Sequence, residues 1–335
     1  MDAALTTPAV TRAPATGRRR ALTGAALALA VIALLALGAV LPKWLQFLVT
    51  MAASHGLVSL GIVLMMRGGV VSFGQGLVFA AGAYAAALAY TRLGITDALG
   101  LAAIGAAAAT LVAAPFAPLL ARYRGIFFAM LTLALSMVAY GVLVKTEALG
   151  GSDGFNMGRA TIFGTRIDDA WVGWVLYAVT IGVSALLALL ARFAFDSTRG
   201  LVTLATRDNE LRVEYLGGSV RRTMAYNFLL AAAAGGAGGA LTVMALGHVD
   251  PNFSYWTTSG EFVFVAILAG WQSVLAVFVA STVLEIVRSF SNLYFPNTWQ
   301  LALGLFLLFV IRFLPRGIGS LWIERSGTRR GAGRR

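Results

Sequence analysis

Few residues in this chain of 335 amino acids could carry out catalysis. There is no cysteine, so disulfides, thiolate metal sites and a cysteine nucleophile are excluded. The two histidines, His55 and His248, are far apart in the sequence, whereas a zinc site needs three or four nitrogen, sulfur or oxygen ligands. Neither the Gly-Lys-Ser/Thr of a phosphate-binding loop nor a His-Glu-x-x-His pair is present. The chain is therefore not expected to be an enzyme or to hold a metal or cofactor of its own.

A few polar side chains lie within or beside apolar runs, where they are costly unless they meet protein or a water path. Ser72 and Gln75 belong to a glycine-rich segment that begins at Gly68. They fit two interpretations, which are close packing between helices and the lining of a transport pathway. His55 lies inside an apolar run, either as a hydrogen-bonded core residue or as a functional group.

Glu285 and Arg288 belong to the long apolar run 261–290. They are three residues apart, so they are neighbours on a helix and are expected to form a local, structural ion pair. The run is too long for one ordinary membrane span of about 20 residues. Because Gly270 and the polar residues after it interrupt the run, we expect a short helix at 261–270, a break, and a second helix at 273–290.

The longest polar stretch in the interior of the chain is 192–222. Three apolar residues in it fall on one helical face, namely Leu201, Leu204 and Ala205. Asp208 and Asn209 can cap a following short helix at 210–216, and Gly217 would end it. Two short amphipathic helices of this kind fit either a groove in a partner protein or a solvated surface loop.

The composition excludes a soluble enzyme and a disordered chain. Hydrophobic residues make up 59% of the sequence and charged residues only 12%, and the mean hydropathy is +0.81. A soluble domain has about 25% charged residues, and disorder requires low hydrophobicity. Since one membrane span takes about 20 residues, the chain has room for roughly eight to eleven spans.

Apolar runs separated by polar breaks predict an all-α polytopic membrane protein with ten spans, one of them short or broken. The first run is too long for the apolar core of a signal peptide, so it is expected to be a retained span. The predicted spans are 21–41, 44–66, 70–90, 99–121, 126–144, 171–191, 223–246, 261–270, 273–290 and 299–313.

The distribution of charge supports this count. With ten spans, 20 of the 26 basic residues fall on the side of the two termini and 6 on the other. Basic residues gather in cytoplasmic loops, so both termini are expected in the cytoplasm. An unsplit run at 261–290 would place the arginine-rich C-terminus outside. The net charge of +12 is explained by this topology, and no nucleic-acid partner is needed to account for it.

Five segments, in order, resemble the branched-chain amino acid ABC permeases of the LivH/LivM family, in particular its LivM branch. The stretch 195–217 is similar to the family's cytoplasmic coupling loop. The other four segments are Val71-Ser-Phe-Gly-Gln-Gly running on to Gly82-Ala-Tyr84, Arg124-Gly-Ile-Phe-Phe-Ala-Met-Leu-Thr-Leu-Ala134, Gly150-Gly-Ser-Asp-Gly154 and Arg312-Phe-Leu-Pro-Arg-Gly-Ile318. Together the five span about 57–320.

The chain departs from the family pattern at two places. At the predicted break the family reads G-G-x-G-S/T-x-x-G-P-x-x-G-A, whereas this chain has Ala269-Gly-Trp-Gln-Ser-Val-Leu-Ala-Val-Phe-Val-Ala280, which keeps only Gly270 of the glycines and lacks the proline. Leu149 stands where the LivM branch has threonine before the Gly-Gly pair. The first change affects close packing at the break, and the second affects the assignment of a particular substrate.

The resemblance implies a type II ABC importer permease fold. It implies a cytoplasmic tail at 1–21, a transmembrane permease domain at 22–314 with its coupling loop at 194–222, and a basic cytoplasmic tail at 315–335. The residues implied for the translocation pathway are Ser72, Gln75, Tyr84, Gly150, Gly151, Ser152, Asp153 and Gly154. Those implied for coupling to an ATPase are Arg199, Gly200, Arg207, Asp208, Asn209, Glu210, Leu216 and Gly217.

By the same resemblance, the chain is expected to be a permease subunit that moves branched-chain, hydrophobic amino acids across a bacterial inner membrane by alternating access. The implied partners are a second, LivH-like permease, two ABC ATPase subunits that use ATP, a periplasmic substrate-binding protein, and membrane lipid. Urea or short amides, and aromatic acids, remain alternative substrates. An ion-coupled secondary transporter is the alternative of another class, and it would require carboxylates in the middle of the membrane. A membrane-embedded enzyme is the third possibility.

Overall fold

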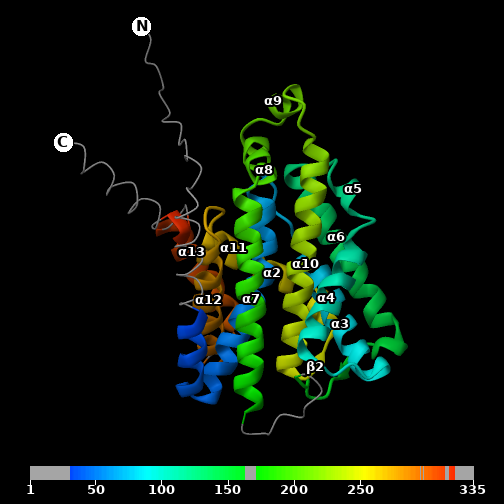
Figure 1. The fold of residues 1–335 in the computed structure, drawn as a ribbon, viewed down its shortest axis with the longest axis vertical. Helices are drawn as coiled ribbons and strands as arrows, with labels where there is room; N and C mark the ends of the chain where they lie inside the picture. Colours follow the sequence, from blue (N-terminus) through cyan, green and yellow to red (C-terminus); the bar gives the residue numbers. More distant parts are fainter. Residues whose placement is uncertain (1–30, 163–170, 295, 297, 314–316, 321–335) are drawn as a thin grey trace, which may run out of the picture.

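The computed structural model is an all-helical bundle with most helices along one long axis (Figure 1). It describes residues 31–162, 171–294, 296, 298–313 and 317–320. The predicted tails at 1–21 and 315–335 lie outside the described residues, apart from 317–320. After a short apolar helix at Val31–Val40, the α-helices are α2 (Lys43–Met66), α3 (Gln75–Leu93), α4 (Ala98–Ala113), α5 (Ala117–Leu120), α6 (Gly125–Lys145), α7 (Val172–Asp196), α8 (Thr198–Asp208), α9 (Glu210–Tyr215), α10 (Val220–Leu246), α11 (Trp256–Ala269), α12 (Val274–Tyr294) and α13 (Trp299–Phe313).

The predicted all-α class is confirmed, and every predicted apolar run contains helix in its described part. The run 99–121 is divided between α4 and α5, and the run 70–90 becomes helical only from Gln75. Among the described residues, six helices are long and apolar enough to cross a membrane, namely α2, α3, α6, α7, α10 and α12. Shorter apolar helices accompany them, including α4 and α11. The central helices α2 and α10 are mostly buried, whereas α6 and α12 expose apolar side chains on much of their surface.

Helix α10 packs against α2, α3 and α4 at the centre of the bundle. Its middle carries Gly235, Gly236, Gly238 and Gly239. A Cβ atom on Gly236 would overlap the backbone of Gly105 in α4, and one on Gly239 would overlap the backbone of Phe79 in α3. Small residues allow such approach in a membrane, where close packing rather than the hydrophobic effect holds helices together. The glycine-rich run therefore makes α10 the close-packed axis of the fold.

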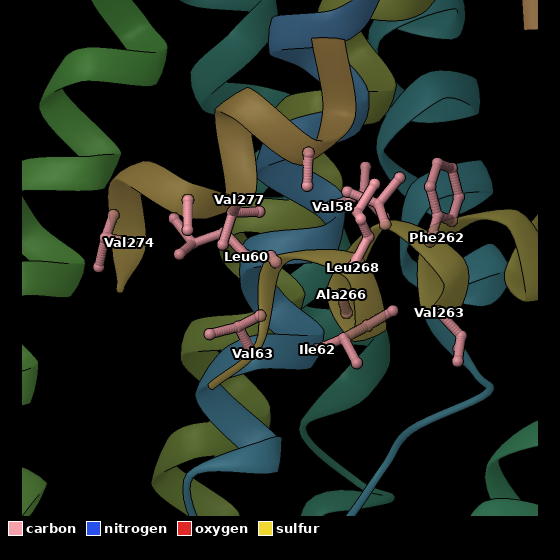
Figure 2. Close-up of a cluster of buried hydrophobic side chains, with 14 of the residues drawn as sticks. Val58, Leu60, Ile62, Val63, Phe262, Val263, Ala266, Leu268, Val274 and Val277 are labelled. Atoms are coloured by element: carbon pink, nitrogen blue, oxygen red, sulfur yellow. The ribbon is translucent and has the colours of Figure 1, made fainter. Parts of the chain in front are cut away.

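The break predicted between 270 and 273 is confirmed. Helix α11 ends at Ala269 and α12 begins at Val274. Gly270 has a φ of +74°, a conformation that glycine adopts without a steric penalty. With 14 residues, α11 is about 21 Å long, which is shorter than the hydrocarbon core of about 30 Å. Figure 2 shows apolar side chains of α2, α11 and α12 gathered around this break, among them Leu60, Val263 and Val277.

The two ends of the bundle differ, and we name them by their elements. Helix α10 runs from Val220, beside α9, to Leu246, beside strand β2 (Figure 1). At the second end, β1 (Phe155–Asn156) pairs with β2 (His248–Val249) in a small antiparallel sheet. The end that carries α8 and α9 is the α9 end, and the opposite one is the sheet end.

After β2 the chain turns back into the bundle through a short 3₁₀ helix, η2 (Pro251–Ser254). The ring of Phe253 lies 5.0 Å from that of Phe79 on α3. The N–H of Gly76, near the start of α3, donates to Ser259 Oγ at 2.9 Å. Irregular backbone inside a membrane is tolerated only where protein surrounds it or where it lines a cavity. The segment 250–258 meets that condition, because it is packed on α3 and borders the cavity described below.

Candidate functional site

The two short helices α8 and α9 form the α9 end of the molecule (Figure 1). Ser197 caps α8, since its hydroxyl accepts a hydrogen bond from the N–H of Gly200 at 3.2 Å. Asn209 caps α9, since its side-chain oxygen accepts from the N–H of Arg212 at 2.9 Å. Such caps satisfy N–H groups that the start of a helix leaves unpaired. The predicted cap at Asn209 is confirmed, whereas Asp208 is the last residue of α8.

The predicted amphipathic character of α8 is present, but its small and polar side is the buried one. Gly200, Thr203 and Thr206 are buried, and Thr203 accepts a hydrogen bond from Asn227 of α10 at 3.0 Å. Large apolar side chains point outward along α8 and α9, with exposed fractions of 61% for Leu201, 65% for Leu211, 88% for Tyr215 and 82% for Leu216. An exposed apolar patch of this kind marks a surface that contacts another molecule.

Two arginines of α8 lie on aromatic rings of other segments. The guanidinium carbon of Arg207 is 4.1 Å from the ring centroid of Trp271, in the break between α11 and α12. That of Arg199 is 4.6 Å from the ring centroid of Tyr226 on α10. Such cation–π contacts contribute about 0.5–1 kcal/mol at exposed sites. Helix α8 is thus in direct contact with the break between α11 and α12 through Trp271.

The turns around α8 and α9 require glycine at two predicted positions. A Cβ atom on Gly200 would overlap the backbone of Ala194 at the end of α7. Gly217, just after α9, has a φ of +83°, which favours glycine. At the start of α9, Glu210 Oε1 accepts a hydrogen bond from Arg124 Nε at 2.6 Å. This ion pair connects α9 to the residue that precedes α6.

Ser72 and Gln75 lie at the start of α3 and are both buried. The hydroxyl of Ser72 accepts from the N–H of Gly74 at 3.3 Å. A Cβ atom on Gly74 would come within 2.7 Å of the carbonyl oxygen of Thr132 on α6. One on Gly235 of α10 would come within 3.1 Å of Gln75 Oε1. These approaches favour close packing as the reason for the small residues here, and a pathway role for the two side chains stays a prediction.

The other predicted pathway residues lie toward the sheet end. Tyr84 is buried on α3 and meets Phe155 of β1 edge to face, with ring centroids 5.9 Å apart. The turn Gly150–Gly154 packs on β2, where a Cβ atom on Gly154 would overlap the carbonyl of Val249. The structure therefore does not gather the eight predicted pathway residues, all of which it describes, into one site.

The turn at 150–154 has a conformation that depends on glycine, because φ is +90° at Gly150, +58° at Gly151 and +67° at Gly154. Its sequence, Gly150-Gly-Ser-Asp-Gly154, also fits the G-x-S-x-G pattern of serine hydrolases. However, the turn follows a 3₁₀ helix, η1 (Glu147–Leu149), rather than a strand, and Ser152 Oγ donates to Asp153 Oδ1 at 3.0 Å. The strand–turn–helix context of a nucleophile elbow is thus missing.

A cavity of about 740 Å³ opens between α2, α3, α10, α11 and α12. This volume lies within the range of roughly 300–1,000 Å³ that is usual for small-molecule sites. Leu246, where α10 reaches the sheet end, lines the cavity, and so does His55, halfway along α2. The cavity therefore reaches from the sheet end to the middle of the bundle. None of the eight predicted pathway residues is part of its wall.

Two contacts between ionisable side chains of different helices lie in the wall of this cavity. His55 Nδ1 lies 3.1 Å from Glu285 Oε2, which connects α2 to α12. Arg288 lies 3.0 Å from Glu261 Oε2, which connects α12 to α11. The sequence predicts that Glu285 pairs with Arg288, whereas the structure places His55 of α2 against Glu285 and Glu261 of α11 against Arg288. Charged side chains within a membrane protein are costly, so they are found paired and facing the interior.

Sequence reasoning missed this cluster. In the sequence, Glu261 only begins the apolar run 261–290, and Glu285 is interpreted as one partner of a local pair with Arg288. The available signal was the presence of three charged residues in one otherwise apolar stretch, 261–290, which in a membrane protein indicates a functional site. Among the described residues, no group of three His, Cys, Asp or Glu side chains is placed to hold a metal ion.

Comparisons with known proteins agree with a membrane permease. The family model described as branched-chain amino acid transport system / permease component matches residues 44–311. The chain is 27% identical over 294 residues to the high-affinity branched-chain amino acid transport system permease protein LivM of Escherichia coli (strain K12), covering 80% of this chain and 68% of that protein. No solved structure matches the chain.

The family match covers most of the chain, including every helix from α3 to α12. A permease component of an ABC system has no ATPase site of its own and works in a complex with other subunits, which agrees with the absence of a phosphate-binding loop from this sequence. The chain is a multi-pass membrane protein rather than an enzyme, and it belongs to the family of branched-chain amino acid transport permease components.

Proposed function

We propose that this chain is the LivM-like permease subunit of an ABC importer, which moves branched-chain, hydrophobic amino acids across the bacterial inner membrane by alternating access. It pairs with a second, LivH-like permease, and a periplasmic binding protein delivers the substrate. Two ABC ATPase subunits use ATP at the cytoplasmic side. No cofactor belongs to this chain. Both termini are cytoplasmic in this arrangement.

The observation that carries the proposal is the contact of α8 with the helix break. The ATPases would dock on the exposed apolar patch of α8 and α9, which includes Leu201, Leu211 and Leu216. Because Arg207 of α8 lies on Trp271, a displacement of α8 would reach the break and the two helices that start from it. Alternating access requires such a bias between two states of the membrane helices.

Charge supports the same orientation. The α9 end carries several arginines within a short stretch, namely Arg199, Arg207, Arg212, Arg221 and Arg222. Lys and Arg accumulate in cytoplasmic loops, so the α9 end faces the cytoplasm and the sheet end faces the periplasm. The exposed apolar side chains of α6, α7 and α12 then meet lipid and the second permease.

The direct test is uptake of radiolabelled L-leucine into proteoliposomes that hold the complete complex of both permeases and both ATPases. With its binding protein outside and ATP inside, uptake should depend on ATP and be abolished by orthovanadate. A complex whose ATPase lacks its catalytic glutamate is the control, and it should be inactive. Uptake that continues without ATP would contradict the proposal.

One observation favours a second candidate, the ion-coupled secondary transporter. A transporter of this class requires carboxylates in the middle of the membrane. Glu261 and Glu285 both lie within helices that border the cavity. The same proteoliposomes separate the two candidates. Uptake driven by a proton or sodium gradient, and unaffected by vanadate, would favour the secondary transporter, whereas ATP-dependent uptake in the absence of any gradient would exclude it.

A further inference from the structure

The cavity at the sheet end has an unbalanced charge. Among the described residues that line it are the carboxylates of Asp250, Glu261 and Glu285, the guanidinium of Arg288 and the imidazole of His55. Carboxylates therefore outnumber cationic groups in the described part of the wall. A buried excess of negative charge is costly unless a cation compensates for it. The cavity is thus suited to a ligand with a positive group and not to an anion.

The carboxylates are positioned to accept further hydrogen bonds. Glu285 uses Oε2 toward His55, and Glu261 uses Oε2 toward Arg288. An ionised carboxylate has about four acceptor positions, so each retains capacity for the N–H groups of an ammonium ion. The two lie on α12 and α11, and their charges are close enough to act on each other.

Beside the charged groups, the wall has polar side chains, such as Asn252 and Asn292, and a group of aromatic rings. The ring centroids of Phe79 and Phe262 lie 5.0 Å apart, and those of Phe79 and Phe253 are also 5.0 Å apart. The imidazole of His55 meets Phe262 edge to face at 5.5 Å. An aliphatic side chain placed on these rings would bury apolar surface, at about 25 cal/mol for each Å². The aromatic group thus lies directly beside the His55–Glu285 pair.

From this juxtaposition we infer that the cavity is a substrate site of the permease itself and that it selects zwitterionic amino acids with apolar side chains. The α-ammonium group binds between Glu285 and Glu261, the α-carboxylate is bound by Arg288, and the side chain lies on Phe79, Phe253 and Phe262. The inference rests on the proposed function. It distinguishes the substrates left open by the sequence, since urea has neither charge nor an apolar body, and aromatic acids are anions that the negative wall would repel.

The test measures equilibrium binding of radiolabelled L-leucine to the complete complex in nanodiscs, without binding protein or ATP. Two competitors keep one half of the zwitterion each: 4-methylpentanoate lacks the ammonium group and isoamylamine lacks the carboxylate. Leucine should compete best, isoamylamine more weakly, and 4-methylpentanoate and urea not at all. Equal competition by 4-methylpentanoate and leucine would overturn the inference, and this experiment needs only the unmodified protein.

The matched variants are Glu285→Gln in the cavity and Glu147→Gln, an exposed carboxylate at the sheet end outside it. Loss of a charge-assisted hydrogen bond weakens binding by about tenfold to a hundredfold, so Glu285→Gln should raise the Kd for leucine by that factor and Glu147→Gln should leave it unchanged. An unchanged Kd in both would overturn the inference. ATP-driven uptake would still stand in that case, whereas absence of any ATP-driven amino-acid uptake by the unmodified complex would refute the proposed function instead.

Discussion

The α9 end and the sheet end both reverse the usual order of polar and apolar side chains, but in opposite ways. At the α9 end, small and polar residues such as Thr203 are buried and large apolar ones such as Leu216 are exposed. At the sheet end, the charged groups of Glu261 and Glu285 lie inside the bundle among aromatic rings. A protein surface would cover the first, and a charged small molecule would complement the second.

One element joins the two ends. The break at Gly270–Ser273 meets Arg207 of α8, while the helices on either side of it carry Glu261 on α11 and Glu285 on α12 into the cavity. The comparison therefore predicts that changes at the α9 end affect transport without affecting binding, and that changes in the cavity affect binding first.

The largest effect is expected in the middle of the bundle, which supports both ends. Gly236→Leu would insert a side chain where Gly105 of α4 leaves no room. Overpacking of this kind costs about 1–3 kcal/mol or more, so leucine binding and uptake should be lost together with folded protein. Gly141→Leu on α6, where a Cβ atom meets nothing within 4 Å, is the control. The yield of monodisperse protein and the thermal unfolding in detergent are measured for both variants. A Gly236→Leu protein of normal stability would contradict the interpretation of α10 as a close-packed axis.

At the α9 end, Arg207→Glu should abolish ATP-dependent uptake while the chain still inserts into the membrane and still binds leucine. The substitution removes the cation from the Trp271 ring and places a negative charge there. Arg222→Glu is the control, because Arg222 is exposed in the first turn of α10. It makes the same charge change at the α9 end and should retain uptake. Normal uptake by the Arg207→Glu complex would rule out this route of coupling.

Reversal of a single ion pair gives a smaller and recoverable effect. Glu210→Arg places two arginines together where Arg124 now donates to Glu210, so α9 should be displaced and uptake lost. The double variant Arg124→Glu with Glu210→Arg restores the attraction and should regain much of the uptake. Because the pair is partly exposed, the melting temperature should hardly change. Loss of uptake in the double variant equal to that in the single one would show that Glu210 acts through another contact.

The smallest effect concerns the aromatic ring at the break. Trp271→Ala removes a cation–π contact worth about 0.5–1 kcal/mol, so the uptake rate should fall by about two- to fivefold. Trp271→Phe keeps an aromatic ring under Arg207, so the uptake rate should fall less. If the alanine and phenylalanine variants transport equally well, the ring itself has no part in coupling.

The helices, the break and the caps follow from the sequence because their causes are local. Apolar length marks the spans, Gly270 marks the break, and Asn209 marks the start of α9. The cavity could not be predicted in this way. His55 and Glu285 are 230 residues apart, and only the packing of α2 against α12 brings them together. The sequence also shows that Leu201 lies on an apolar face, but whether that face is buried depends on how α8 packs against α10.

In the proposed mechanism, movement of α8 against the helix break drives transport without forming the binding site. The absence of cysteine from this chain allows one pair, Arg207→Cys with Trp271→Cys, to be joined by a cleavable thiol cross-linker in a complex whose other subunits are also cysteine-free. The cross-linked complex should bind leucine with an unchanged Kd but not transport it, and cleavage of the linker should restore uptake, while each single cysteine variant should be insensitive to the reagent. ATP-dependent uptake at the normal rate with the cross-link in place would contradict the claim.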